Sequence, residues 1–105
     1  MTREPDLQLS RMQAEIAKVL ASPIRLRILD QIGTGEVAHR TLLSRLGISK
    51  TNLSQHLAIL RKGGILRVRR EGVHVHYRLT YPEITELCSA MRDILSKHIK
   101  ENGRS

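Results

Sequence analysis

Apolar residues recur at intervals of three and four positions over most of this chain, which is the spacing of amphipathic helices. A first helix is predicted from about residue 9, with apolar positions at Leu9, Met12, Ile16, Val19 and Leu20. A short second helix follows, because Ser22 can cap its start, Pro23 suits the first helical position and Gly33 ends it. The first third of the chain is therefore predicted to be helical.

Two more short helices are predicted in the middle of the chain, and a tight turn joins them. The first begins near His39, stops before Gly47 and has apolar residues at Leu42, Leu43 and Leu46. Ser49 stands directly before the second, where its hydroxyl can accept a hydrogen bond from a free backbone N–H group. Two short helices connected in this way form a helix-turn-helix signature.

The last part of the chain predicts a hairpin and a helix. The segments 65–70 and 73–79 alternate between apolar and polar residues, as strands do, and Glu71 and Gly72 between them are the expected turn. Residues 36–38 are a further short extended piece. A final amphipathic helix begins at Pro82, and its apolar stripe is Ile84, Leu87, Cys88, Met91, Leu95 and then His98 or Ile99.

The expected fold class is mainly α with a small β-hairpin, made of about five helices and two strands. A chain of 105 residues is long enough for one domain with a modest core. We place that domain at residues 7–101 and expect residues 1–6 and 102–105 to be disordered. Phe and Trp are absent and Tyr occurs twice, so the core must be aliphatic, which favours packed helices.

Composition also narrows the chemistry. The single cysteine, Cys88, leaves no pair for an internal disulfide or for a Cys-x-x-Cys metal site. The sequence has no signal peptide and no apolar run of about 18 residues, so we expect a cytoplasmic protein without membrane contact. No nucleophile–base pair, Gly-rich phosphate loop or carboxylate pair at a useful spacing is visible, so we expect neither an enzyme nor a cofactor.

The net charge of +8 is concentrated in the middle of the chain. From Val37 to Arg70 there is no Asp or Glu, and this acid-free segment holds the eight basic residues Arg40, Arg45, Lys50, Arg61, Lys62, Arg67, Arg69 and Arg70. The rest of the chain has ten basic and ten acidic residues. A basic segment on a neutral scaffold is typical of a surface that binds nucleic-acid phosphates, although a solvated basic face is the simpler alternative.

The helix predicted to follow Ser49 has one apolar and one polar face. Leu53, Leu57 and Leu60 fall together and must point into the core. The opposite side carries Thr51, Gln55, Ala58 and Lys62, with Lys50, Asn52 and Ser54 at its edges. Thr, Asn, Ser and Gln are weaker helix formers than the Glu–Lys pairs of an ordinary solvated face, but they can bind base edges. The pattern favours a helix that reads DNA in the major groove.

The order of these motifs resembles the winged helix-turn-helix repressors of the ArsR/SmtB family. The resemblance rests on the stretches VLASPIRLRILDQI, LLSRLGISKTNLSQHLAILRKGGIL and RREGVHVHYRL, and it runs from about Val19 to Leu79. It implies a homodimer formed by the first and last helices, which places two reading helices on a palindromic operator in double-stranded DNA. It also implies a repressor that leaves the operator on a signal, and it leaves the inducer and an activating role open.

Carried over position by position, the resemblance assigns a DNA-binding role to eight residues of this chain. The base-reading residues would be Lys50, Thr51, Ser54 and Gln55. Arg40 and Thr41 would lie near phosphate, with Arg69 and Arg70 of the hairpin beside them. The two hairpin arginines would contribute affinity and salt dependence more than sequence choice.

Two metal sites of the family are not matched here. Its thiolate site lies in a Glu-Leu-Cys-Val-Cys-Asp-Leu stretch, and the aligned residues EVAHRTL place Ala38 and Arg40 at the thiolate positions. The site on the last helices would fall on Tyr81, Glu83, Ile94 and Lys97, among which only the glutamate is a ligand. His74 and His76 could face a metal together, but exposed titratable side chains are the simpler interpretation. No metal site is predicted.

Cys88 is the one candidate sensor residue, because it lies on the apolar stripe of a helix expected at the dimer interface. A thiol- or redox-responsive repressor is therefore an alternative, although a buried inert thiol is the default for a single cysteine. A winged-helix module that binds protein or RNA is another alternative, which the acid-free segment disfavours for a protein partner. The leading hypothesis is a sequence-specific DNA-binding transcriptional regulator.

Overall fold

In the computed structural model, residues 4–103 are described. The elements, in chain order, are α1 (Glu4–Leu20), α2 (Pro23–Ile32), β1 (Glu36–Ala38), α3 (His39–Leu46), α4 (Lys50–Lys62), β2 (Leu66–Glu71), β3 (His74–Leu79) and α5 (Glu83–Asn102). Five helices and a hairpin were predicted, and both are confirmed. No helix within residues 4–103 has the length and apolar character needed to cross a membrane.

The residues that predicted the helix ends adopt the expected cap geometry. The Ser22 hydroxyl accepts a hydrogen bond from the backbone N–H of Arg25 at 3.3 Å, at the start of α2. The Ser49 hydroxyl accepts from the N–H of Asn52 at 3.1 Å, at the start of α4. Gly47 ends α3 with φ +63°, a left-handed conformation that other residues rarely adopt, and so allows the tight turn between α3 and α4.

Both terminal helices extend beyond the domain bounds of residues 7–101. Helix α1 already begins at Glu4, and α5 continues to Asn102. Residues 1–3 and 104–105, which were expected to be disordered, lie outside the described residues. The domain bounds stay a prediction.

The sheet has one strand more than the predicted hairpin, because β1 joins it. The strands are antiparallel in the order β1-β3-β2, with Val37 opposite Tyr77 and Val68 opposite the same tyrosine. The expected turn at Glu71–Gly72 is wrong by one position, since Glu71 still pairs with His74 and the turn is formed by residues 72 and 73. Gly72 takes the first turn position with φ +60°, where two-residue hairpins favour glycine.

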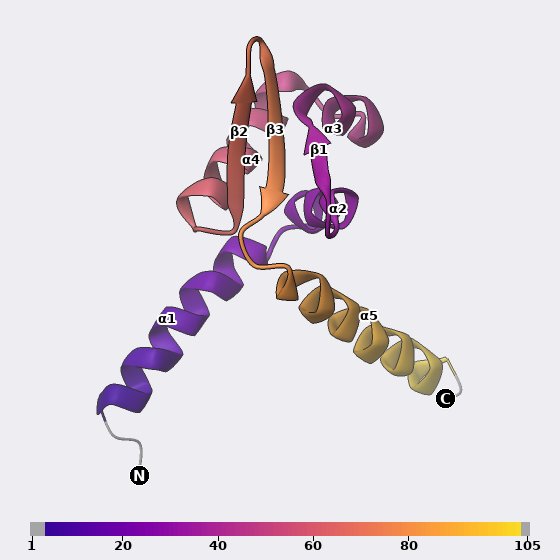
Figure 1. The fold of residues 1–105 in the computed structure, drawn as a ribbon. Helices are drawn as coiled ribbons and strands as arrows, with labels where there is room; N and C mark the ends of the chain where they lie inside the picture. Colours follow the sequence, from indigo (N-terminus) through magenta and orange to yellow (C-terminus); the bar gives the residue numbers. More distant parts are fainter. Residues whose placement is uncertain (1–3, 104–105) are drawn as a thin grey trace.

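The molecule consists of a packed body and two projecting helices (Figure 1). The body is held by an aliphatic core with one tyrosine, to which α2, α3, α4 and the sheet all contribute. Helices α1 and α5 diverge from one end of the body, and the tip of the β2–β3 hairpin lies at the opposite end. This arrangement leaves long stretches of both terminal helices without cover from other residues of the described range 4–103.

Candidate nucleic-acid interface

Helix α4 divides into the two faces that its sequence predicted. Leu53, Leu57 and Leu60 are buried and fix the helix in the core. On the other side Lys50, Thr51, Ser54 and Gln55, together with Asn52 and Lys62, are exposed. The core leucines thus hold the helix so that its polar side chains face outward.

The outward side chains of α4 are free to bind a partner. Within residues 4–103, no hydrogen bond or ion pair engages the side chains of Lys50, Thr51, Ser54 and Gln55. A short polar side chain on a solvated helix often bonds back to its own backbone, which removes it from recognition. Here the donors and acceptors point away from the protein and suit base edges and phosphates.

The inner face of the hairpin lies beside α4 and forms a shallow hollow with it. The hollow has a volume of about 100 Å³, and among the residues that line it are Ser54, Arg61, Val68 and Tyr77. Strand alternation places Arg70 on the same sheet face as Val68. Burial raises the pKa of the Tyr77 phenol, and the positive charges of Arg70 and Arg61 oppose that shift, so both guanidinium groups lie close enough to act on the ring.

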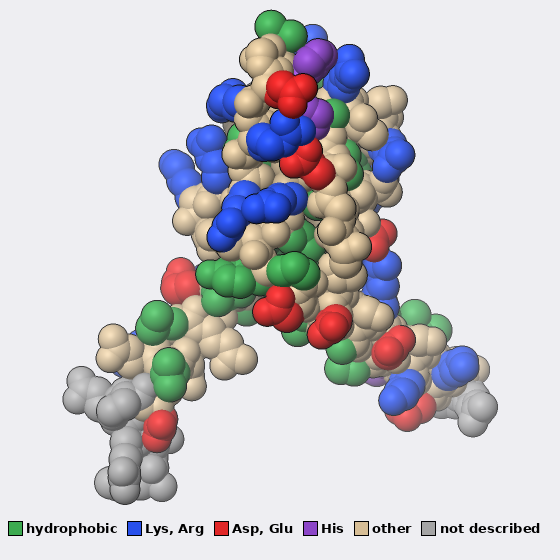
Figure 2. All heavy atoms as spheres, in the orientation of Figure 1, with side chains coloured by type: hydrophobic (Ala, Val, Ile, Leu, Met, Phe, Trp, Pro, Cys, Tyr) green, Lys and Arg blue, Asp and Glu red, His purple; other side chains and the backbone are tan. Residues whose placement is uncertain are grey.

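Arg69 points to the other face of the sheet and is bound there. Its Nη2 lies 2.6 Å from Glu36 Oε1 of β1, and its Nη1 lies 2.6 Å from Glu71 Oε2. The Arg69 guanidinium lowers the pKa of both carboxyl groups through these hydrogen bonds. Figure 2 shows this outer face of the hairpin, with acidic and basic side chains intermixed over β2 and β3.

The predicted hairpin pair is therefore split between two surfaces. Among the eight basic residues of the acid-free segment, Arg69 is the one that forms an ion pair within the described part of the chain. Its two partners, Glu36 and Glu71, are the carboxylates that immediately flank this segment in the sequence. The sequence pattern located the carboxylates but did not reveal that both converge on one arginine.

The start of α3 packs against the hairpin near its tip. Arg40 is exposed and shares a hollow with Val73 and His74, whereas Thr41 is half-buried. His39 Nδ1 lies 3.0 Å from the Tyr77 hydroxyl, so this histidine joins α3 to the central strand. This contact gives His39 a structural role within the protein.

A half-buried arginine that the sequence did not single out joins three helices. The Arg25 Nε donates to the carbonyl oxygen of Val19 at 2.6 Å and Nη2 donates to that of Lys18 at 3.3 Å, at the end of α1. Its Nη1 lies 3.3 Å from Nδ1 of His56 on α4. His56 therefore faces the protein and is not part of the outward face of α4.

Cys88 lies on α5 and lines hollows together with residues of α2, among them Leu26 and Leu29. It is half-buried and packs against the core, and burial raises the pKa of its thiol above the usual value. A raised pKa lowers the fraction of reactive thiolate. Within residues 4–103, no three His, Cys, Asp or Glu side chains are grouped so that they could hold a metal ion.

Comparison with known protein families gives the same type of domain. Residues 20–69 match the family model described as a helix-turn-helix domain. The HTH-type transcriptional regulator Rv0081 of Mycobacterium tuberculosis is 35% identical over 102 residues, covering 96% of this chain and 87% of that protein. A biofilm growth-associated repressor from Xylella fastidiosa is 33% identical over 101 residues, covering 96% of this chain and 89% of that protein.

Relatives with the opposite regulatory effect also match. The transcriptional activator HlyU of Vibrio cholerae is 39% identical over 69 residues, which cover 66% of this chain and 64% of that protein. Similarity at this level therefore identifies a regulator of transcription without choosing between repression and activation.

Solved structures agree with the sequence comparison. The crystal structure of Rv0081 superposes with a TM-score of 0.80 at 35% identity, covering 90% of this chain and 95% of that chain. A homodimeric winged helix-turn-helix DNA-binding domain from Mycobacterium bovis, Mb0332, superposes with a TM-score of 0.80 at 28% identity. The match covers 94% of this chain and 92% of that chain. This chain therefore belongs to the helix-turn-helix transcriptional regulators, as a DNA-binding member with the winged fold of the ArsR type.

Proposed function

We propose that this regulator is a homodimer that binds a palindromic operator through α4 of each copy and leaves it when a signal arrives. The observation that carries the proposal is the outward face of α4, where Lys50, Thr51, Ser54 and Gln55 are exposed and form no side-chain hydrogen bond with any described residue. These four side chains read bases, while Arg40, Thr41 and Arg70 contact phosphates around them. Arg69, which the resemblance also placed near phosphate, acts on DNA indirectly by holding the hairpin.

The two projecting helices support the dimer. From residue 6 to Lys18 every residue of α1 is exposed, and the helix meets the body through Val19 and Leu20 at its end. A helix of this length without packing is marginally stable in water, so its helical state calls for a partner. The uncovered apolar side chains of the two helices are Leu7, Leu9, Met12, Ile16, Leu87, Met91, Ile94, Leu95 and Ile99.

A second copy of the chain is the partner that fits both helices. Apart from Leu7, the exposed apolar residues recur along one side of each helix, as in antiparallel or parallel helix packing between subunits. The hairpin tip lies at the opposite end of the molecule from α1 and α5 (Figure 1). Pairing through the helices therefore leaves both DNA-binding ends free, and a two-fold axis matches a palindromic site.

Operator binding and dimer formation are tested separately. Fluorescence anisotropy with the protein's own promoter region is expected to show much tighter binding than to random duplex, with affinity falling steeply as salt rises. Equal affinity for both duplexes would refute sequence-specific reading. Analytical ultracentrifugation of Leu95→Glu is expected to show monomers, whereas the matched variant Ser96→Glu, on the side of α5 away from the apolar stripe, stays dimeric.

A further inference from the structure

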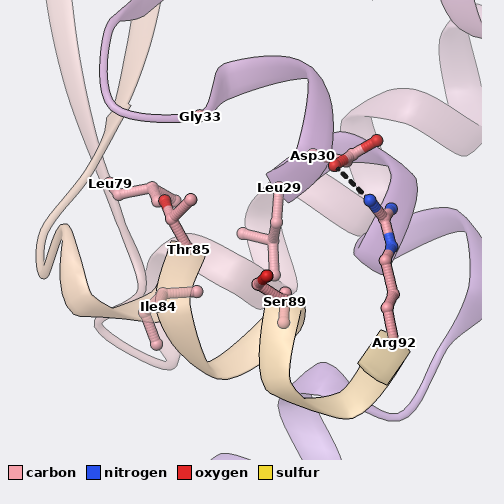
Figure 3. Close-up of a pocket in the computed structure, with 9 residues that line it drawn as sticks. Leu29, Asp30, Gly33, Leu79, Ile84, Thr85, Ser89 and Arg92 are labelled. Carbon is pink, nitrogen blue, oxygen red and sulfur yellow. Dashed lines mark ion pairs between the residues drawn. The ribbon is translucent and has the colours of Figure 1, made fainter. Parts of the chain in front are cut away.

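A cavity of about 220 Å³ lies between α2 and α5, below the end of β3 (Figure 3). Leu29, Leu79 and Ile84 supply apolar walls, and the turn at Gly33 closes one side. About seven water molecules occupy this volume in the liquid. The cavity is smaller than most pockets that bind drug-sized ligands. The cavity is therefore suited to a small organic molecule.

Hydroxyl groups of α5 line the same cavity. Thr85 and Ser89 are one helical turn apart and project from α5 toward α2 (Figure 3). The Thr85 Oγ1 is buried and has no hydrogen-bond partner within residues 4–103, and the Ser89 hydroxyl has none either. A buried hydroxyl without a partner is unfavourable for the protein alone, so a bound molecule that accepts its hydrogen bond would gain affinity.

An ion pair forms the remaining side of the cavity. Arg92 crosses from α5 to α2, where its Nη1 lies 2.9 Å from Asp30 Oδ1 (Figure 3). No other hydrogen bond or ion pair of Arg92 occurs within the described residues, so the guanidinium retains N–H donors for a ligand. Asp30 offsets part of the positive charge of Arg92, while the remaining N–H groups of Arg92 and the two hydroxyls offer hydrogen-bond donors to a ligand.

Cys88 lies in the wall between these polar groups. Desolvation raises the pKa of its thiol, and the nearby Asp30 raises it further, whereas Arg92 opposes the shift. A raised pKa lowers the fraction of thiolate, which disfavours nucleophilic reaction with an oxidant. It contributes a small, mostly apolar surface and favours reversible binding over covalent chemistry at this site.

We propose that this cavity binds a small organic carboxylate, whose anionic group is held by Arg92 and the Thr85 and Ser89 hydroxyls while its apolar part lies against Leu29, Leu79 and Ile84. The carboxylate accepts the hydrogen bonds that the protein leaves unmade, and Arg92 can bind it in a forked geometry. This proposal rests on the proposed function, because it supplies the signal that releases the operator.

The position of the cavity links it to DNA binding. Helix α5 meets the body by packing against α2, and α2 in turn packs against α3 and α4. A ligand between α2 and α5 changes the angle at which α5 leaves the body. In the dimer, that angle sets the distance between the two reading helices, so a small change at the cavity is expected to weaken operator binding.

The binding test uses NMR on the full-length free protein with sodium benzoate and sodium isovalerate as probes. Benzamide and benzylamine serve as the neutral and cationic counterparts of benzoate. The carboxylates are expected to give saturable shifts of the backbone amides of Thr85, Cys88 and Ser89 at millimolar concentration. The absence of such shifts, or saturation by benzylamine in preference to benzoate, overturns the proposal.

Variants show whether the cavity itself is the site. Thr85→Val replaces the unbonded hydroxyl by a methyl group, so we expect about tenfold weaker benzoate binding with an unchanged or raised midpoint of thermal unfolding. Arg92→Gln is expected to lower the affinity for benzoate at least as much. Thr34→Val changes an exposed threonine outside the cavity and is expected to leave that affinity unchanged. Undiminished binding by Thr85→Val and Arg92→Gln would place the probe elsewhere and refute the site.

The last measurement is the effect of benzoate on operator affinity. A negative result here can be told apart from a failure of the proposed function. Benzoate is expected to lower the operator affinity of the unaltered protein and to have no effect on that of Thr85→Val. If benzoate occupies the cavity while operator affinity stays constant, the signalling role is wrong. If the protein binds no operator at all, the proposed function fails, yet benzoate binding to the free protein still tests the cavity.

Discussion

The two faces of the hairpin differ in the state of their arginines. On the outer face, Arg69 forms ion pairs with Glu36 of β1 and with Glu71 at the end of β2. On the inner face, Arg70 and Arg61 each act on Tyr77, and neither arginine has a carboxylate partner within residues 4–103. Two adjacent residues of one type thus have opposite electrostatic surroundings, because successive strand residues point to opposite faces.

This difference shows that the number of basic residues overstates the charge available to DNA. A guanidinium that is already bound by two carboxylates must lose those bonds before it can bind phosphate. A free guanidinium releases counterions from DNA and gains affinity directly. Arg70 is therefore the hairpin residue expected to contact DNA, and Arg69 is expected to stabilise the sheet by linking β2 to β1 across β3.

The largest effect on operator binding is expected for the outward face of α4, which is rich in exposed hydrogen-bonding groups. Gln55→Ala should cost about 1–3 kcal/mol of operator binding, because a base contact is lost, and should change binding to random duplex little. Competition binding with operators substituted at each base pair should also show a weaker base preference of the variant at one position. An equal loss on all duplexes would mean that Gln55 contacts the DNA backbone.

A smaller effect is expected for the two hairpin arginines, and it should differ between them. Arg70→Ala should lower operator affinity about tenfold and reduce the slope of log affinity against log salt by about 1, as expected for one lost phosphate contact. Arg69→Ala serves as the matched control and should leave the salt slope nearly unchanged. Equal slopes for the two variants would contradict the assignment of separate roles.

The smallest effect is expected from acid, through the two carboxylates that hold Arg69. Their pKa values are lower in the folded protein than the ordinary value of 4.5, so their stabilisation is fully present above that value. It is lost as the pH falls below about 4.5 through the lowered folded values. Urea unfolding should therefore give a lower free energy of unfolding in this acidic range than at pH 7.

Substitution then isolates the contribution of Glu36. Glu36→Gln should reduce the pH dependence of unfolding in that window, and Glu86→Gln, whose carboxylate forms no ion pair within the described residues, should not. If the unaltered protein and Glu36→Gln respond alike, the carboxylates do not stabilise the sheet. The effect should remain small, because exposed ion pairs are screened by water and salt.

Much of the fold could be predicted from the sequence because its signals are local. Ser22 and Ser49 cap helices through residues three positions away, and the spacing of Leu53, Leu57 and Leu60 defines the buried side of α4. The outward face of α4 followed from the same spacing. The hairpin turn was displaced by one residue, because strand alternation alone leaves the last pair of a ladder undefined.

By itself, the sequence determined the helices, their apolar and polar sides, and the basic segment without acids. Only the tertiary structure decided which charges stay free, which helices are left uncovered and where a cavity forms. Arg69 lies 33 residues from Glu36, and the pair forms because β3 aligns β1 and β2 on either side of it. Because α5 packs against α2, Arg92 reaches Asp30, and the buried Thr85 hydroxyl has no hydrogen-bond partner among residues 4–103. Such contacts depend on strand register and helix packing between distant segments, which no local pattern specifies.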